Sequence, residues 1–241
     1  MADVLLDVQG VTKRFGGFRA LSEVSLQIRD GERFGLIGPN GSGKTTLINC
    51  ISGTLRTDGG RILLQSRDIT RLAAHRRTRL GIARSFQIPK PFKSMTVLEN
   101  LRIPLEYVTQ READGRDPTS EALEILRLMG LQAKADVTAM GLTQIDLRKL
   151  ELARAMAAKP RLLIADEAMA GLSATEVDDI LTILFQLNGR GITVIMIEHI
   201  MRAVMRFSER IAVLDAGEKI AEGTPDQILG NKAVERAYLG E

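Results

Sequence analysis

Residues 33 to 46 read RFGLIGPNGSGKTT, and the apolar stretch LINCISG follows them closely. The segment predicts a short strand, a glycine-rich turn and a helix, and it fits the spacing G-x-x-x-x-G-K-[ST]. Backbone N–H groups of such a turn point at phosphate oxygens, while Lys44 neutralises phosphate charge and Thr45 presents a hydroxyl to Mg²⁺. The alternative is an ordinary glycine-rich turn, which does not require a strand before it and a helix after it. We therefore expect phosphate groups to be bound by Gly38, Pro39, Asn40, Gly41, Ser42, Gly43, Lys44, Thr45 and Thr46.

A second segment, RLLIADE at 161 to 167, places two carboxylates after an apolar run. The run is typical of a strand buried on both faces of a parallel sheet. Ligands of open α/β sheets bind at the carboxyl ends of the strands. We therefore expect Asp166 to hold Mg²⁺ and Glu167 to act as the general base for a hydrolytic water. The alternative is that the two acids only cap the next helix.

Two more polar residues belong to this predicted site. His199 ends the apolar run ITVIMIEH, and Gln87 lies in SFQIPKP. A histidine at the end of a core strand is often a buried structural residue, but an end at the same sheet edge as Asp166 favours contact with a γ-phosphate. Gln87 is expected to touch Mg²⁺ or the water through its amide. The predicted catalytic residues are thus Lys44, Gln87, Glu167 and His199, and the predicted metal ligands are Thr45, Gln87 and Asp166.

Composition excludes several classes of protein. The 241 residues are 44% hydrophobic and 26% charged, which fits a folded globular chain and excludes a disordered or fibrous one. No apolar run is long enough to span a bilayer, and the first residues do not resemble a signal peptide. The single cysteine, Cys50, excludes an intrachain disulfide. These features predict a cytoplasmic location.

The distribution of apolar residues predicts an α/β fold with a mostly parallel sheet. Alternation in VLLDVQGVTKRF indicates strands of an N-terminal antiparallel β subdomain. Thr96 and Glu99 form a capping-box pattern and Pro118 marks a second helix start, so the middle of the chain is expected to be helical. We predict a single domain over 1–241, with an α/β core from 1–87 and 161–241 and an inserted helical subdomain at 88–160.

Three smaller segments also carry predictions. The polar stretch TQREADGRDP at 109–118 is expected to be a mobile surface loop, and IAVLDAGEKIAEG to be a hairpin turning at DAGE. The one dense basic stretch, RLAAHRRTRLGIAR at 71–84, is interpreted as a solvated helix face without chemistry. The net charge is only +3 and there are nine aromatics, seven Phe and two Tyr, so a nucleic-acid partner is not expected.

Taken together, GPNGSGKTT, SFQ, LTQIDLRKLELARA, LLIADE and the histidine strand resemble the motifs of the ATP-binding cassette ATPases, in the family's order. KRFGGFRAL, RSFQIPKPFKSMTVLENL, VLDAGEKIAEGTP and AYLGE look most like the ATP-binding subunits of branched-chain amino acid importers. The resemblance implies a P-loop NTPase fold, hydrolysis of ATP with Mg²⁺, and a dimer that sandwiches ATP between the phosphate loop of one subunit and the signature of the other. It also implies that closure of the dimer drives transmembrane permease subunits.

The same resemblance suggests roles for residues outside the phosphate loop. Phe15 would stack on adenine, although it could be a packed strand aromatic, and Phe18 is a rival for the role. The region after Gln87 would form the groove that receives a helix of a permease subunit, with Phe92 and Met95 either lining it or lying in the core. A periplasmic or extracellular solute-binding protein would act indirectly. Attachment to the inner face of the cell membrane would then depend on partner subunits and not on lipid.

The signature departs from the family pattern LSGGQ. This chain has Leu142, Thr143, Gln144, Ile145 and Asp146, where Thr143 keeps a hydroxyl for the γ-phosphate of the opposite subunit. A β-branched Ile145 removes the freedom of glycine, and Asp146 is expected to add negative charge near that phosphate. A neighbouring backbone arrangement could still grip ATP. We favour a heterodimer with a second cassette bearing an intact signature, and a homodimer stays possible.

These observations predict an ATP-hydrolysing subunit that powers an importer for branched-chain amino acids or a related small polar solute. One alternative is a soluble ATPase of this family that acts on nucleic acid, which would be expected to carry a long coiled-coil or DNA-binding insert. Another is a regulatory module that senses ATP without turnover. Lys44, Asp166, Glu167 and His199 are all present, which argues against the second alternative.

Overall fold

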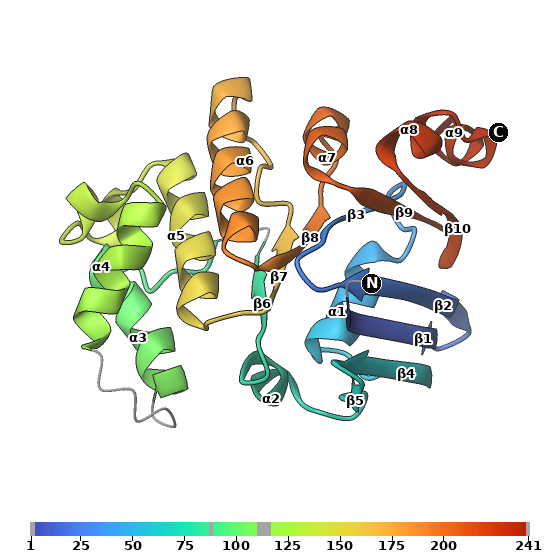
Figure 1. The fold of residues 1–241 in the computed structure, drawn as a ribbon, viewed down its shortest axis with the longest axis horizontal. Coiled ribbons are helices and arrows are strands. Elements are labelled where there is room, and N and C mark those ends of the chain that lie inside the picture. Colours follow the sequence, from blue (N-terminus) through green and yellow to red (C-terminus); the bar gives the residue numbers. More distant parts are fainter. Residues whose placement is uncertain (1–2, 87–88, 110–116, 240–241) are drawn as a thin grey trace.

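The computed structural model of the chain describes residues 3–86, 89–109 and 117–239. Two sheets and a set of helices at one end organise the fold (Figure 1). The four-stranded sheet has the order β2-β1-β4-β5 and is antiparallel, and the six-stranded sheet has the order β10-β9-β3-β8-β7-β6. Within the larger sheet only the β9–β10 pair is antiparallel. The predicted α/β fold with a mostly parallel sheet and an N-terminal antiparallel β subdomain is confirmed.

The strands are short in the large sheet and long at the amino end of the chain. Their bounds are β1 Val4–Phe15, β2 Phe18–Arg29, β3 Arg33–Ile37, β4 Gly59–Leu64, β5 Arg67–Asp68, β6 Ile82–Ser85, β7 Leu162–Asp166, β8 Thr193–Ile197, β9 Arg210–Asp215 and β10 Glu218–Gly223. The helices are α1 Lys44–Ser52, α2 Ala74–Thr78, α3 Val97–Thr109, α4 Pro118–Leu128, α5 Gln144–Ala157, α6 Ala174–Gly189, α7 Met201–Phe207, α8 Pro225–Leu229 and α9 Lys232–Leu239.

The large sheet is covered on both faces, which explains the continuous apolar runs of its strands. Along β7, Leu163 and Ala165 pack in a core with α6 and α7, while Leu162 and Ile164 pack in a second core with α1 and the antiparallel sheet. Figure 1 shows α6 and α7 on one side of this sheet and α1 on the other. All five residues of β7 and of β8 are buried. The central strands therefore hold the site between two cores.

Helices α3, α4 and α5 pack together beyond the β6 edge of the large sheet (Figure 1). The predicted capping box at the start of α3 is present, since the Thr96 N–H donates to Glu99 Oε2 at 2.8 Å and the Glu99 N–H donates to Thr96 Oγ1 at 3.1 Å. Helix α4 begins at Pro118, as expected. Most of the predicted loop at 109–118 lies outside the described residues.

Helix α4 is capped by Asp117, whose carboxylate accepts from the N–H groups of Thr119 and Ser120. At the other end of the chain, β9 and β10 form the predicted hairpin, and its turn holds Ala216 at φ 45° and Gly217 at φ 82°. Helices α8 and α9 both contact β10, the edge strand of the large sheet. The amino-acid pattern thus located the β9–β10 hairpin correctly.

The interpretation of residues 71–84 as a solvated helix face is wrong. Helix α2 covers only Ala74–Thr78, and Ile82–Ser85 is strand β6 of the large sheet. Arg77 is 1% exposed, and its guanidinium donates to the carbonyls of Cys50, Ile51, Thr70 and Leu72. Burial lowers the pKa of Arg77. This arginine ties the carboxyl end of α1 to the segment that leads into β6.

Candidate nucleotide-binding site

The glycine-rich turn between β3 and α1 has the backbone of an anion site. Gly38, Gly41 and Gly43 have φ values of 150°, 81° and 103°. A Cβ at Gly38 would lie 2.1 Å from the Leu214 carbonyl oxygen, and one at Gly43 would lie 2.7 Å from the Ala20 carbonyl oxygen. Side chains at these two positions would therefore require the backbone to shift. Glycine is needed here because of both the conformation and the space.

The amino end of α1 is open to a ligand. Helix α1 spans Lys44–Ser52, and its N-cap residue, Gly43, has no side chain to accept a hydrogen bond from the first N–H groups. N–H groups without a capping side chain and the helix dipole favour an anion at this end. The turn and the helix start therefore fit the phosphate groups of a nucleotide.

Lys44 folds back over the turn. Its Nζ donates to the carbonyl oxygens of Gly38 and Pro39 at 2.7 and 2.9 Å, and lies 3.5 Å from Ser42 Oγ. Burial lowers the pKa of Lys44, and the nearby carboxylates Glu167 and Asp166 partly oppose that shift. The charge of Lys44 is therefore directed to the turn. Among the described residues, Lys44 forms no salt bridge with Glu167 or Asp166.

A cavity of about 280 Å³ connects the turn with the other predicted residues. It is lined by Phe15, Phe18 and Ala20 from the antiparallel sheet, Asn40, Gly41, Ser42, Gly43, Lys44, Thr45 and Thr46 from the turn and α1, and Glu167 and His199 from the ends of β7 and β8. Phe15 and Phe18 face each other across the β1–β2 hairpin and are 48% and 66% exposed. Phe15 is therefore not a packed core aromatic, and both rings are available to a ligand.

Glu167 and His199 contact each other at the edge of this cavity. His199 Nε2 lies 3.1 Å from Glu167 Oε1, and the Glu167 N–H donates to the Ile197 carbonyl at 2.9 Å. Glu167 has φ 48°, a left-handed conformation that a side chain adopts at a cost. The surrounding strands maintain this strained backbone, a feature common at functional sites. The two residues come together as the sequence predicted.

Asp166 precedes Glu167 at the end of β7, and a basic residue that the sequence interpretation set aside reaches it. Arg84 Nε and Nη2 donate to Asp166 Oδ2 at 3.1 and 2.6 Å, and Arg84 Nη1 donates to Asn49 Oδ1 at 2.6 Å. The signal that could have found Arg84 is its place in β6, because β6 pairs with β7 and ends beside it. Gln87 lies outside the described residues.

A buried carboxyl behind His199 was also missed. Glu198 is 3% exposed, and its Oε1 accepts from the Met169 N–H at 2.8 Å. Burial raises the pKa of Glu198 to about 7, with the charge of Glu167 acting in the same direction. On the other side of the 168–172 loop, Arg148 Nη2 donates to the Ala170 carbonyl at 3.0 Å. These contacts fix the loop after Glu167 to β8 and to α5.

The altered signature starts a regular helix. Thr143 is the N-cap of α5, and a capping box joins it to Asp146. The Thr143 hydroxyl lies 2.6 Å from Asp146 Oδ2, which also accepts from Lys134 Nζ at 2.5 Å. Burial acts to raise the pKa of Asp146, but the bonds from Lys134 and Thr143 leave it below its ordinary value. Thr143 does not line the cavity around Lys44.

The structure adds a partner for Asp146 that the sequence argument about its charge near phosphate did not include. The Asp146 side chain is 9% exposed and is paired with Lys134, so its charge is compensated within the chain. Ile145 packs against the core that contains α5, and neither Gln144, Ile145 nor Asp146 has a positive φ. The side chain of Gln144 instead extends to Gly171, where an added Cβ would lie 2.7 Å from Gln144 Nε2.

A phosphate-binding turn, a strand-end acid pair and a histidine on the next strand define the chain as a phosphate-loop ATPase. The chain belongs to the ATP-binding cassette family: the profile described as ABC transporter matches residues 21–170. A second profile, branched-chain amino acid ATP-binding cassette transporter, matches residues 218–241. The chain is accordingly an ATP-binding protein that hydrolyses ATP.

Curated relatives match from end to end. The high-affinity branched-chain amino acid transport ATP-binding protein LivG of Salmonella typhimurium is 39% identical over 100% of both chains. The probable branched-chain amino acid transport ATP-binding protein LivG of Archaeoglobus fulgidus is 38% identical over 98% of this chain and 95% of the relative. The lipopolysaccharide export system ATP-binding protein LptB of Haemophilus influenzae is 34% identical over 98% of each.

Solved structures agree on the fold. The ADP conformation of MJ1267, an ATP-binding cassette of an ABC transporter, is 34% identical with a TM-score of 0.88 over 99% of both chains. A dimeric post-hydrolysis state of the cassette MJ0796 bound to ADP and Pi is 28% identical with a TM-score of 0.82, over 92% of this chain and 99% of that one. No helix among residues 3–86, 89–109 and 117–239 is long and apolar enough to cross a membrane.

Proposed function

We propose that the chain is the ATP-hydrolysing subunit of an importer for branched-chain amino acids or a related small polar solute. The observation that carries the proposal is the end-to-end similarity to LivG proteins, together with the match of residues 218–241 to the branched-chain family profile. The similarity to LptB supports a transport ATPase but does not indicate the transported substrate. The relatives named above are transport proteins, and this favours the importer over the nucleic-acid and sensor alternatives.

The site residues have separate roles in this proposal. The turn from Gly38 to Thr46 binds the phosphates through its backbone, Lys44 balances their charge, and Phe15 or Phe18 stacks on adenine. Glu167 accepts a proton from the attacking water, and His199, in contact with Glu167, meets the γ-phosphate. Asp166 and the Thr45 hydroxyl, with Gln87 from outside the described residues, would hold Mg²⁺. Bound there, Mg²⁺ would supply charge stabilisation to the phosphates.

The roles of Lys44 and Glu167 can be separated by experiment. Lys44→Ala is expected to weaken binding of nucleotide, because a buried phosphate loses its compensating cation. Glu167→Gln is expected to retain ATP and stop hydrolysis, because only the proton acceptor is lost. Nucleotide binding and phosphate release measured on the assembled transporter distinguish the two. Hydrolysis by the Glu167→Gln protein at the unmutated rate would show that Glu167 is not the base.

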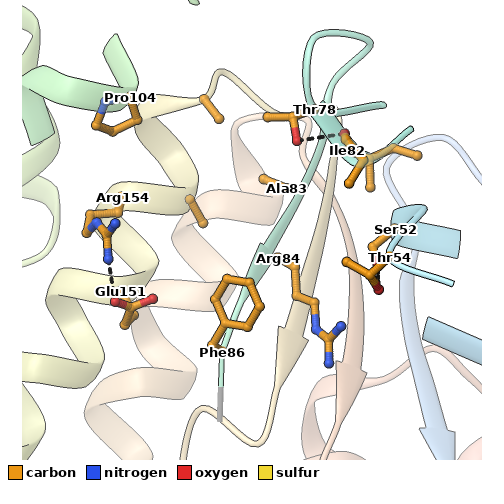
Figure 2. A pocket seen from close by; sticks show the side chains of 13 residues that line it. Ser52, Thr54, Thr78, Ile82, Ala83, Arg84, Phe86, Pro104, Glu151 and Arg154 are labelled. Carbon is orange, nitrogen blue, oxygen red and sulfur yellow. Dashed lines mark hydrogen bonds and ion pairs between the residues drawn. The ribbon is translucent and has the colours of Figure 1, made fainter. Parts of the chain in front are cut away.

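We propose that residues 88–160 form the subdomain that meets the permease. A cavity of about 250 Å³ lies between β6 and helices α3 and α5 (Figure 2). Phe86 is 43% exposed in its wall, and Glu151 and Arg154 form an ion pair on the α5 side. The partly apolar cavity fits a short helix of a membrane subunit. Phe92 and Met95 do not line the cavity, and Phe92 is 43% exposed, with Arg154 5.1 Å from its ring centroid.

The proposed partner in the dimer is a second cassette with an intact signature. In this chain the Thr143 hydroxyl and the Asp146 N–H are engaged with each other in the capping box, and the helix start has side chains where glycine would let a phosphate approach the backbone closely across a dimer. One competent site would then use the Lys44 turn of this chain and the signature of its partner. The position of the chain on the inner face of the cell membrane would depend on these subunits, and a solute-binding protein outside would act through the permease.

Two measurements test the assembly. In the complete transporter, Lys44→Ala is expected to reduce ATP hydrolysis far more than the same change in the partner's phosphate loop, and equal losses would contradict the asymmetric dimer. Reconstituted with permease and solute-binding protein, the transporter is expected to accelerate hydrolysis when leucine, isoleucine or valine is supplied. Acceleration by another solute alone would reassign the cargo without changing the ATPase role.

A further inference from the structure

Arg84 connects three parts of the site. Its side chain leaves β6, and its guanidinium bridges the Asp166 carboxylate at the end of β7 and the Asn49 amide on α1. Both Nε and Nη2 donate to one oxygen of Asp166, Oδ2. Among the described residues, no hydrogen bond reaches the other oxygen, Oδ1. The arginine therefore occupies one side of the carboxylate only.

Burial makes this contact strong. The side chains of Arg84 and Asp166 are 11% and 9% exposed. An ion pair removed from water is screened little, and the fork of the guanidinium restricts the orientation of its acceptor. Asn49 adds a second anchor, since Nη1 donates to its side-chain oxygen at 2.6 Å. With both ends held, rotation of the Asp166 carboxylate would require breaking charged hydrogen bonds.

The backbone around Asp166 is also tied to β6. The Asp166 N–H donates to Ser85 Oγ at 3.3 Å, and Ser85 pairs with Ala165 in the β6–β7 ladder. On the far side, the Arg84 guanidinium lies 5.5 Å from the centroid of the Phe86 ring. Figure 2 shows the Arg84 guanidinium directed away from the Glu151–Arg154 pair on the α5 side of the cavity. The arginine thus faces the carboxylate and not the opposite wall.

We propose that Arg84 is a positioning residue that orients Asp166 for Mg²⁺, by holding Oδ2 and leaving Oδ1 for the hydrated metal ion. The inference rests on the role of Asp166 in the function proposed above. Carboxylates at metal sites depend on the groups that hydrogen-bond them, and loss of such a group typically costs 10- to 100-fold in metal affinity. Arg84 does not need to touch nucleotide or metal to have this effect.

The test measures how much Mg²⁺ strengthens nucleotide binding in the absence of turnover. The full-length chain is titrated with a fluorescent, non-hydrolysable ATP analogue in EDTA and in Mg²⁺. The dissociation constant in EDTA divided by that in Mg²⁺ gives a ratio that is compared between variants. Arg84→Met is expected to reduce this ratio about tenfold, with little change of the dissociation constant in EDTA. Arg84→Lys keeps a charge but cannot bridge Asp166 and Asn49 together, so an intermediate reduction is expected.

A matched control and two further outcomes complete the design. Arg161→Met removes an arginine at the opposite end of β7, where it pairs with Asp30 at 3.4 Å, and is expected to leave the ratio unchanged. If Arg84→Met weakens nucleotide binding equally in EDTA and in Mg²⁺, the proposal is overturned, because a purely structural role of Arg84 would give that result. A larger ratio would also overturn it, since the cation would then compete with the metal.

Asp166→Asn separates failure of this inference from failure of the proposed site. If Asp166→Asn lowers the ratio and both Arg84 variants leave it intact, the positioning role of Arg84 is wrong while the metal role of Asp166 stands. If Asp166→Asn leaves the ratio intact, the metal role of Asp166 is itself wrong. Melting temperatures show which variants are folded, and Arg84→Lys carries the test if Arg84→Met does not fold.

Discussion

Replacement of Glu198 by glutamine is predicted to change the pH dependence of stability. The carboxyl is 3% exposed, accepts a hydrogen bond from the Met169 N–H, and has Glu167 and Arg148 as its charged neighbours. Burial raises its pKa to about 7 in the folded chain, from an ordinary value of 4.5. Glutamine keeps the acceptor oxygen for Met169 and does not titrate. The substitution therefore isolates the charge from the hydrogen bond.

The sign and size follow from proton linkage. Between pH 4.5 and about 7 the folded chain retains a proton that the unfolded chain has lost, so the carboxyl lowers stability progressively as the pH rises. The penalty grows by about 2.5 kcal/mol between pH 5 and pH 8 and changes little above that. Between pH 5 and pH 8, the free energy of unfolding of Glu198→Gln should therefore rise by about 2.5 kcal/mol relative to that of the native chain. This corresponds to about 5–10 °C in melting temperature.

The assay is unfolding by urea and by heat at pH 5 and pH 8, with both proteins in the same buffers. Glu235→Gln removes an exposed carboxylate on α9 and serves as the control for a change in surface charge. The quantity of interest is the difference in stability between variant and native chain, compared across the two pH values. If that difference is the same at pH 5 and pH 8, Glu198 does not titrate in this interval and the reasoning from burial is refuted.

Other predictions concern the ligand and the core. Either Phe15→Ala or Phe18→Ala should weaken nucleotide binding by about tenfold while the other has little effect, and equal small effects would exclude a stacking role for both rings. Arg77→Met should cost about 3 kcal/mol in urea unfolding, because four carbonyls lose a buried charged donor, and a cost near zero would contradict that role. Urea unfolding should show that Lys134→Met destabilises the chain less as the pH falls from 7 into the acid range, because Lys134 helps to hold the pKa of Asp146 below its ordinary value and this stabilisation is lost once Asp146 is protonated. The isolated chain should not sediment with protein-free liposomes at physiological salt, and co-sedimentation would refute attachment through partners alone.

Part of this protein can be predicted from short-range sequence. The strand, turn and helix around GPNGSGKTT, the acid pair after LLIA and the capping box of α3 all depend on residues close together in the chain. Their backbone requirements are local, such as a positive φ or an N-cap, so the residue types are sufficient. The strand-end argument also placed Glu167 beside His199, since parallel strands end at the same edge.

Other assignments failed because they depended on side-chain partners far away in the sequence. The basic stretch at 71–84 has the composition of a solvated surface, yet Arg77 is buried against α1 and Arg84 pairs with Asp166. The argument about the charge of Asp146 likewise left out its pairing with Lys134, which lies twelve residues earlier in the chain. Charged side chains such as arginine and aspartate are expected to be exposed unless a buried partner is known for them. Only the folded chain shows that partner.

The sequence alone determined the phosphate-binding turn, the ATPase class and the α/β architecture, because backbone geometry and strand patterning are encoded by neighbouring residues. Tertiary structure alone decided which charges are paired and which carboxyls are buried. Arg84 reaches Asp166 only because β6 and β7 are adjacent, and the pKa of Glu198 is raised because the folded chain buries its carboxyl. Electrostatic properties depend on distance and solvent exclusion, and both arise when remote segments pack together.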